Sequence, residues 1–301
     1  MKDRASQTAA MVAAARALGA QLPPQAQLAA DPDGFRFVHP TIAAALRERG
    51  AFTAALRLPG PLRRWIVYMQ VRTRVIDDAL REFVAAGGRQ VLLLGAGYDC
   101  RAHRLAEHLE GAAVFEVDHP ATQRRKRKIL DSSTQPRGAA RYLPWDFERQ
   151  PMADLPAALA AAGHKASEPT LVVWEGVTMY LTKDAIEATV AAVRVLGSAG
   201  SRLVFTYFDR AHVLGQAPWP SRLARAAVAQ VGEPWRWGWA PAELPGWLAE
   251  RRLELVSDTS MPQAAARLLP ARWAREVRER APWRARLAAI GYERIAVTGM
   301  G

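Results

Sequence analysis

Two hydrophobic spacings alternate along the middle of this chain. Short, nearly continuous apolar runs bounded by turn residues predict buried strands. They lie at Gln90–Leu94, Ala113–Val117, Ala140–Pro144, Thr170–Trp174 and Arg202–Tyr207. Stretches with helical spacing separate them, notably Ala121–Leu130, Met152–Ala162 and Lys183–Leu196. This alternation predicts an α/β fold with a parallel sheet covered by helices on both faces. Right-handed crossovers make such a sheet doubly wound.

The two ends of the chain follow other patterns. Residues 1–88 read as alanine-rich helices separated by Pro, Gly and Asp turns, and Val71–Ala86 is the clearest of these helices. After Tyr207 the alternation breaks in a segment rich in Trp, Pro and Arg. A helix at Leu244–Glu250 and strands at Leu253–Ser257 and Glu293–Thr298 then follow. We therefore expect a helical N-terminal lid (1–70), a strand-and-helix core (71–207), a helical, Trp-rich cap (208–240) and a C-terminal completion of the sheet (241–301).

Composition narrows the class of protein. The 301 residues, half of them hydrophobic, suffice for one large domain or a domain with a cap. No apolar run approaches a membrane span, and the N-terminus lacks the apolar centre of a signal peptide. The single cysteine, Cys100, excludes an intramolecular disulfide framework and a cysteine-rich zinc site. The histidines show no metal-ligand spacing. We expect a cytoplasmic protein with no membrane partner and no metal site.

The net charge of +12 raises the question of a nucleic-acid partner. The densest basic run, Arg124 to Lys128, falls on the helix predicted after the second strand. At helical spacing these charges spread around the helix instead of forming one face. The pattern favours a solvated helix surface over a nucleic-acid interface.

Chemistry-bearing residues stand where the first two predicted strands end. The first strand runs into Gly95 and Gly97, and the second ends on Asp118. Glycines there let the backbone approach a ligand, and the carboxylate is placed to accept hydrogen bonds from ribose hydroxyls. A dinucleotide fingerprint needs a third glycine, where this chain has Cys100. Because S-adenosylmethionine has no pyrophosphate to hold, the motif favours that cofactor over NAD. A plain tight turn and a helix cap are the alternative interpretations.

Three further positions extend this hypothesis. Asp146 and Phe147 follow the third strand, where an acceptor could bind the adenine amine and a ring could pack on the purine. Glu175 ends the apolar fourth strand, and a buried carboxylate needs a partner such as the amino group of the cofactor. Arg72 could hold the cofactor's carboxylate by a bidentate pair. Surface pairing with a nearby aspartate is the alternative for Arg72.

Six sequence blocks together carry a family resemblance. They are, in order, RTRVIDD, VLLLGAGYDCRAHRL, VFEVDHPATQRRKR, WDFE, WEGVTMYL and RLVFTYFD. They resemble blocks of bacterial members of the leucine carboxyl methyltransferase family, from about Arg72 to Arg210. The resemblance implies a seven-stranded, Rossmann-like class I methyltransferase sheet with a helical lid and a helical cap insertion. It also implies S-adenosyl-L-methionine as cofactor and S-adenosyl-L-homocysteine as product.

The resemblance also assigns roles to individual residues. It implies that the cofactor is held by Arg72, Gly95, Gly97, Asp118, Asp146, Phe147 and Glu175. His119, which follows Asp118, is a further candidate on the cofactor side. Tyr180 is implied to lie near the methyl acceptor, and Tyr207 and His119 are the other candidates for a catalytic role.

We expect the acceptor to be a hydrophobic small molecule, methylated on a carboxylate to give a methyl ester. A carboxylate is ionised at neutral pH and needs no strong base, and no dedicated His/Asp pair is evident. A phenol or alcohol of secondary metabolism would need a base, which His119 or a tyrosine could supply. Trp219, Trp235, Trp237, Trp239 and Trp247 could line an apolar acceptor site or pack the core of the cap.

Three other functions stay open from the residues alone. They are an RNA-modifying methyltransferase, an NAD-dependent oxidoreductase and a non-catalytic scaffold. The sequence leaves the oligomeric state and the identity of the acceptor undetermined.

Overall fold

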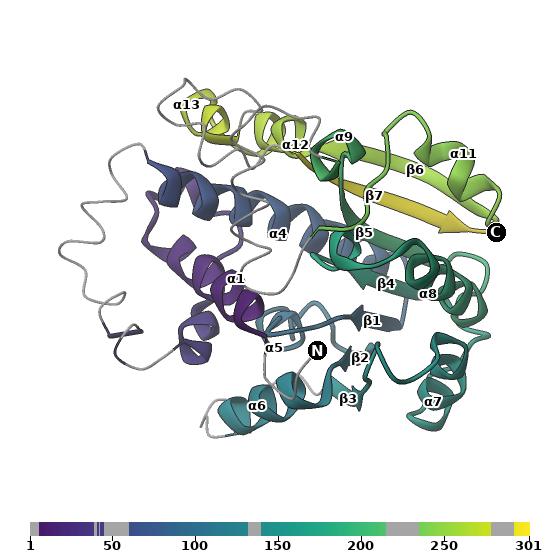
Figure 1. Ribbon diagram of the computed structural model, residues 1–301. Coiled ribbons are helices and arrows are strands. Elements are labelled where there is room, and N and C mark those ends of the chain that lie inside the picture. Colours follow the sequence, from purple (N-terminus) through teal and green to yellow (C-terminus); the bar gives the residue numbers. More distant parts are fainter. Residues whose placement is uncertain are drawn as a thin grey trace.

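One mixed sheet organises the molecule, as the computed structural model in Figure 1 shows. The structure describes residues 6–38, 41, 43–44, 60–131, 140–214, 235–277 and 292–301. Within these residues the strand order is β3-β2-β1-β4-β5-β7-β6. The strands are β1 (Gln90–Leu94), β2 (Ala113–Asp118), β3 (Ala140–Pro144), β4 (Thr170–Trp174), β5 (Arg202–Phe208), β6 (Leu253–Ser260) and β7 (Glu293–Met300). β1 to β5 are parallel, whereas β7 runs antiparallel between β5 and β6. The predicted seven-stranded, doubly wound sheet is confirmed.

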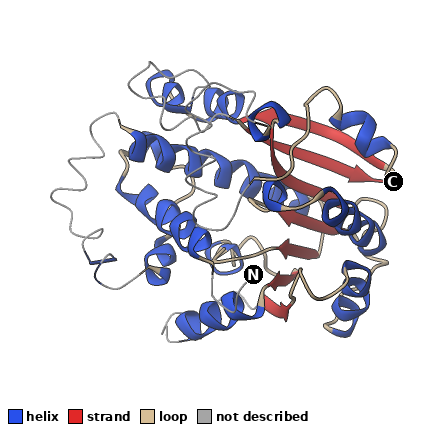
Figure 2. Cartoon of the chain, viewed as in Figure 1, coloured by secondary structure: helices blue, strands red, loops and turns tan. Residues whose placement is uncertain are grey.

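Helices cover both faces of the sheet (Figure 2). One face packs against α1 (Gln7–Leu18), α4 (Pro61–Ala85) and α12 (Met261–Leu268). The other packs against α7 (Leu155–Ala161), α8 (Lys183–Leu196) and α11 (Leu244–Ala249). Other helices within the described residues are α5 (Arg101–Arg104), α6 (Pro120–Asp131), α9 (Arg210–Val213) and α13 (Ala271–Ala274). Short 3₁₀ turns are η1 (Gly19–Gln21), η2 (Pro24–Ala26), η3 (Pro32–Phe37), η4 (Met152–Asp154), η5 (Thr178–Tyr180) and η6 (Arg275–Val277).

Strand β1 shows why the central strands read as continuous apolar runs. All of its residues are buried. Val91 and Leu93 point to the core beneath α4, whereas Leu92 and Leu94 point to the core beneath α8. Because successive side chains face opposite sides, a strand covered on both faces must be apolar throughout.

The structure extends several predicted elements. α4 begins at Pro61 after Gly60, so the boundary expected at residue 70 falls inside one continuous helix. Proline suits a first helical position because its missing N–H would have no partner there. β6 and β7 extend beyond their predicted ends to Ser260 and Met300. The two strands pair antiparallel over this length, with Ser260 opposite Arg294 and Met300 opposite Leu253.

Part of the prediction lies outside the described residues. This applies to most of residues 39–59, within the N-terminal region expected to be helical, and to residues 215–234 of the expected cap, including Trp219. No helix in the described part of the chain is both long enough and apolar enough to cross a membrane.

The two-sided burial of β1 leads to a stability prediction. Leu93 is 2% exposed, so Leu93→Ala should leave a cavity and lower the free energy of unfolding by about 3 kcal/mol. Urea denaturation followed by circular dichroism measures this change. Val195→Ala is the control, since Val195 on α8 is 63% exposed, and it should change the value by less than about 0.5 kcal/mol. Equal losses of the free energy of unfolding in the two variants would contradict the assignment of Leu93 to the core.

Candidate functional site

The glycine turn joins the ends of β1 and β2. Gly95 and Gly97 have φ values of 71° and 51°, which favour glycine. A Cβ at Gly95 would lie 2.7 Å from Cγ2 of Val177, so a side chain there would also collide. The Gly97 N–H donates to Oδ2 of Asp118 over 2.6 Å. The turn therefore brings the glycine backbone and a carboxylate together at the carboxyl ends of β1 and β2.

Asp118 has the environment of a ligand-binding carboxylate. Burial raises its pKa above the ordinary value, and the hydrogen bond from Gly97 opposes that shift. Its carbonyl accepts from the Trp145 N–H over 2.8 Å, which ties the end of β2 to the segment after β3. An acceptor-only group beside a close-approach turn fits a ribose diol.

His119 follows Asp118 directly, and Asp146 follows Trp145, whose N–H donates to the Asp118 carbonyl. The His119 Nε2 is 3.7 Å from Oδ2 of Asp146, and its Nδ1 accepts from the Ala121 N–H over 3.2 Å. A neutral His119 in this arrangement carries its proton on Nε2. It then has no free lone pair with which to take a proton from an acceptor. Phe147 packs partly buried against the core beneath α8.

A buried carboxylate at the end of β4 gathers three guanidinium groups. Oε1 of Glu175 lies 2.6 Å from Nη2 of Arg16 and 2.8 Å from Nε of Arg72. Its Oε2 lies 2.6 Å from Nη1 of Arg101. Because α1, α4 and α5 each supply one arginine, this single carboxylate links three helices to the sheet edge.

The guanidiniums determine the ionisation of Glu175. Burial alone would raise its pKa, but Arg101, Arg16 and Arg72 together outweigh burial and hold the pKa well below its ordinary value. Arg101 is paired further with Asp77 and Asp99. The charges therefore form a connected network rather than a set of isolated pairs.

Sequence reasoning identified Arg72 and Glu175 but not their pairing, and it missed Arg16 and Arg101. Arg16 is 5% exposed, among the buried small residues of α1. A lone arginine on the apolar face of an alanine-rich helix was the available signal, since a buried charge requires a partner. Its partner, Glu175, lies 159 positions away along the chain.

Helix α1 covers the glycine turn and crosses towards α4 (Figure 1). A Cβ at Gly97 would lie 3.2 Å from the Cβ of Ala9. The Ser6 N–H donates to Oγ1 of Thr122 over 3.2 Å, and Arg16 Nε donates to Oγ1 of Thr73 over 3.2 Å. The N-terminal helix is thus held at both ends over the residues that would hold a cofactor.

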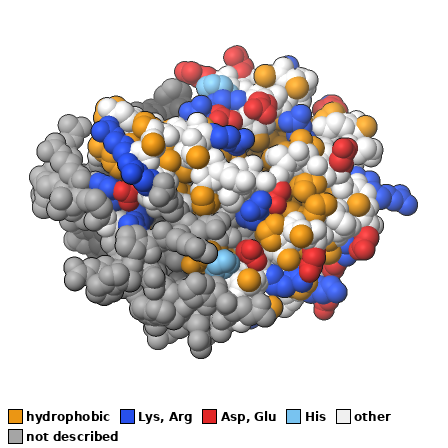
Figure 3. Space-filling model, turned by 90° about the horizontal axis from the view of Figure 1, so that it is seen from above, with side chains coloured by type: hydrophobic (Ala, Val, Ile, Leu, Met, Phe, Trp, Pro, Cys, Tyr) orange, Lys and Arg blue, Asp and Glu red, His pale blue; other side chains and the backbone are white. Residues whose placement is uncertain are grey.

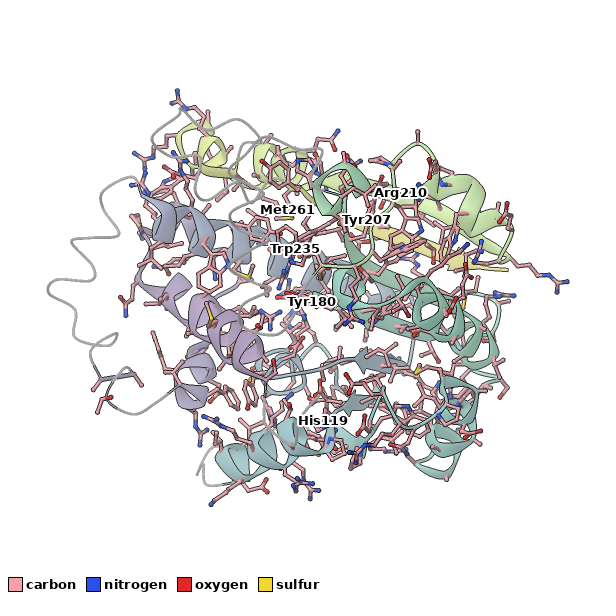
Figure 4. All side chains as sticks on the ribbon, in the orientation of Figure 1. His119, Tyr180, Tyr207, Arg210, Trp235 and Met261 are labelled. Carbon is pink, nitrogen blue, oxygen red and sulfur yellow. The ribbon has the colours of Figure 1, made fainter. Side chains whose placement is uncertain are left out.

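Aromatic side chains gather at the ends of β4 and β5 (Figure 4). The rings of Phe208 and Trp235 meet edge to face, 4.7 Å between centroids. The backbone N–H groups of Arg236 and Trp237 donate to the Met179 carbonyl over 2.7 and 3.3 Å. Tyr180 follows in η5, so these aromatic residues lie next to the Glu175 end of the site.

Tyr207 is not part of this group. Its side chain is fully buried, and its hydroxyl donates to Oδ2 of Asp258 over 2.8 Å. Its ring packs edge to face against Trp239, on the face of β5 opposite to Phe208. These contacts give Tyr207 a packing role, and its placement near the acceptor finds no support in the geometry.

The convergence on Glu175 leads to a pH-dependent prediction. At pH 7, Glu175→Gln should lower the free energy of unfolding by about 3 kcal/mol, because three buried guanidiniums lose their shared counter-charge. The folded-state pKa lies below the ordinary 4.5, so the stabilisation is complete above that value and is lost as the pH falls through the folded pKa. The difference in the free energy of unfolding between wild type and Glu175→Gln should therefore become smaller as the pH falls.

Urea denaturation at a series of pH values measures this difference. Glu187→Gln is the matched control, because Glu187 pairs with Arg251 at the surface and should cost less than about 1 kcal/mol. A difference for Glu175→Gln that stays constant with pH would contradict the assignment.

Comparisons with known proteins find relatives among S-adenosyl-L-methionine-dependent methyltransferases. A relative from Streptomyces coelicolor, assigned as an S-adenosyl-L-methionine-dependent methyltransferase, is 37% identical over 196 residues. That match covers 65% of this chain and 65% of the relative, just under two thirds of the relative's own length. A relative from Frankia alni with the same assignment is 35% identical over 231 residues, 71% of this chain and 76% of the relative.

Solved structures share the fold. A DUF574 family protein from Streptomyces avermitilis superimposes with a TM-score of 0.57 at 20% identity, covering 83% of this chain and 89% of that chain. A protein from Thermobifida fusca assigned as a methyltransferase has a TM-score of 0.56 at 19% identity, covering 99% and 96%. These structural similarities confirm the predicted sheet.

The model of the leucine carboxyl methyltransferase family matches residues 9–194, more than half of the chain. The chain therefore belongs to the leucine carboxyl methyltransferase family.

Proposed function

We propose that this chain is an S-adenosyl-L-methionine-dependent O-methyltransferase that acts on a carboxylate of a hydrophobic small molecule. The observation that carries the proposal is the meeting of Gly97 and Asp118 at the sheet edge, next to a cluster of buried arginines. The carboxylate suits ribose hydroxyls, and guanidiniums suit an amino-acid carboxylate. The donor set fits this cofactor, in a family whose relatives are assigned to S-adenosyl-L-methionine-dependent methylation.

Each part of the cofactor has residues suited to it. Asp118 would hold the ribose, the backbone at Gly95 and Gly97 would lie along the cofactor, and Asp146 with Phe147 would flank the adenine. Arg72, joined by Arg16, would hold the carboxylate. Glu175 would lie at this amino-acid end and keep both arginines in place.

S-adenosyl-L-methionine supplies an electrophilic methyl group on a sulfonium. The chain's own contribution is to align an acceptor oxygen with that group and to exclude water. Phe208 and Trp235, whose rings meet edge to face, would bind an apolar or planar acceptor together with Tyr180.

The contacts of His119 and Tyr207, two of the three catalytic candidates, support an acceptor that is already ionised. Both nitrogens of His119 face other groups. Burial raises the pKa of Tyr207, and Asp258 raises it further, which disfavours loss of the phenolic proton. A carboxylate acceptor needs no base at neutral pH. These observations favour an ester product over the ether that a phenol or alcohol would give.

The contacts of the basic run on α6 do not favour an RNA substrate. Lys126 is fully buried in an ion pair with Glu116, and Arg125 donates to the Phe37 carbonyl over 3.1 Å. On the face shown in Figure 3, basic and acidic side chains of the described residues are interspersed. Arg124, Arg125, Arg127 and Lys128 are exposed, as predicted for a solvated helix surface, whereas the burial of Lys126 differs from that prediction because it pairs with Glu116.

The cofactor assignment predicts the effect of Asp118→Ala. The variant should bind S-adenosyl-L-homocysteine at least about a hundredfold more weakly, because two charge-assisted hydrogen bonds are lost. Isothermal titration calorimetry measures the affinity. Asp154→Ala is the control, since Asp154 is exposed in η4, and it should bind like wild type. If the wild-type protein does not bind S-adenosyl-L-homocysteine, the proposed function is refuted.

The acceptor assignment predicts the effect of Trp235→Ala. We expect the KM for an accepted substrate to rise about tenfold, because an aromatic contact surface is lost, with cofactor affinity unchanged. Arg236→Ala is the control, since the Arg236 side chain is exposed. The substrates come from a panel of aromatic and aliphatic acids, phenols and alcohols.

Treatment with alkali identifies the product, since a methyl ester is hydrolysed and a methyl ether is not. If only phenols are methylated, the acceptor group is a hydroxyl and not a carboxylate. No methylation of any panel member would refute the acceptor assignment.

A further inference from the structure

Glu293 is a second buried carboxyl that contacts Arg72. It begins β7 and is 1% exposed. Nη1 of Arg72 lies 3.1 Å from its Oε2 and 3.3 Å from its Oε1, and the Tyr68 hydroxyl also donates to Oε2. Tyr68 and Arg72 are one turn apart on α4, so they present their side chains on the same face of that helix.

Packing does not account for a glutamate at this position. The next residues of β7 on the same face, Ile295 and Val297, contact the apolar core beneath α4. Burial raises the pKa of Glu293 well above its ordinary value, and Arg16 opposes that shift only in part. A buried carboxyl is costly, so its presence calls for a role that an apolar residue could not fill.

The geometry of Arg72 supplies that role. Its Nε donates to Glu175 over 2.8 Å, while its Nη1 donates to Glu293. Two carboxyl groups on different strands thus bind different nitrogens of one planar group, which fixes the plane. Nη2 and Nη1 lie 3.7 and 3.9 Å from where a Cβ of Gly176 would stand, so this end of the guanidinium lies beside the turn after β4.

We propose that Glu293, supported by Tyr68, is a positioning residue that orients the Arg72 guanidinium for the carboxylate of the cofactor. This inference rests on the proposed function, which assigns that carboxylate to Arg72. Glu293 acts through Arg72 and makes no contact with the cofactor itself. Its effect is therefore confined to ligands that carry the carboxylate.

Two ligands separate this role from a general effect on folding. S-adenosyl-L-homocysteine carries the amino-acid carboxylate, whereas 5′-methylthioadenosine carries the same adenosine and thioether without it. Glu293→Ala should weaken binding of the first about tenfold and leave binding of the second unchanged in calorimetry. Tyr68→Phe should show a smaller loss of the same kind. Glu293→Gln keeps the shape and one acceptor oxygen, and should recover part of the affinity.

A double mutant tests whether Glu293 acts through Arg72. In an Arg72→Ala background, the further change Glu293→Ala should have no additional effect on S-adenosyl-L-homocysteine binding. Glu254→Ala is the control, because Glu254 is exposed on β6, and it should bind both ligands like wild type. If Glu293→Ala does not fold, Glu293→Gln and Tyr68→Phe decide the question with the same two ligands.

The outcomes distinguish this inference from the proposal on which it rests. Equal weakening of both ligands, unchanged binding of both, or additive losses in the double mutant would overturn the role of Glu293. If Arg72→Ala alone leaves S-adenosyl-L-homocysteine binding intact, the assignment of the carboxylate to Arg72 fails, and the role of Glu293 fails with it.

Discussion

The rest of the site depends on the burial of the Glu175 carboxylate under three guanidinium groups. Arg16, Arg72 and Arg101 come from three helices that are remote in sequence, and all three reach the end of β4. An unpartnered charge at this depth would be costly, so the helices and the carboxylate require one another. The ion cluster is therefore both a structural junction and the amino-acid end of the proposed cofactor site.

This junction explains how α1 can cover the Gly97 turn and also form part of the core. The small side chains of α1 let it lie close over the Gly97 turn, with Ala9 in contact distance. Arg16 then connects the same helix to Glu175. A helix held by one buried ion pair and two hydrogen bonds to threonines is tied to the residues that would hold the cofactor. Its stability is thus coupled to the charge state of Glu175.

The two sides of the site differ in how they are built. The proposed cofactor side consists of strand ends, a glycine turn and buried charges, whose positions follow from the sheet. The proposed acceptor side consists of aromatic residues at and after the end of β5, held by backbone hydrogen bonds to Met179 and by the contact of Trp235 with Phe208. Such a division lets one sheet serve different acceptors, because the segment after β5 can change without disturbing Asp118 or Glu175.

The sequence by itself determined the elements that local pattern controls. Each central strand was recognisable because two-sided burial demands an unbroken apolar run, as in Leu92 and Leu93. Gly95, Gly97 and Asp118 were recognisable because turn geometry and strand ends restrict residue type. Only the tertiary structure decided which charges pair: that Glu175 meets Arg16, that Arg72 lies between two carboxyl groups, and that Tyr207 turns away towards Asp258. Pairing of buried charges depends on distances between segments far apart in the chain, and no local pattern of residues encodes those distances.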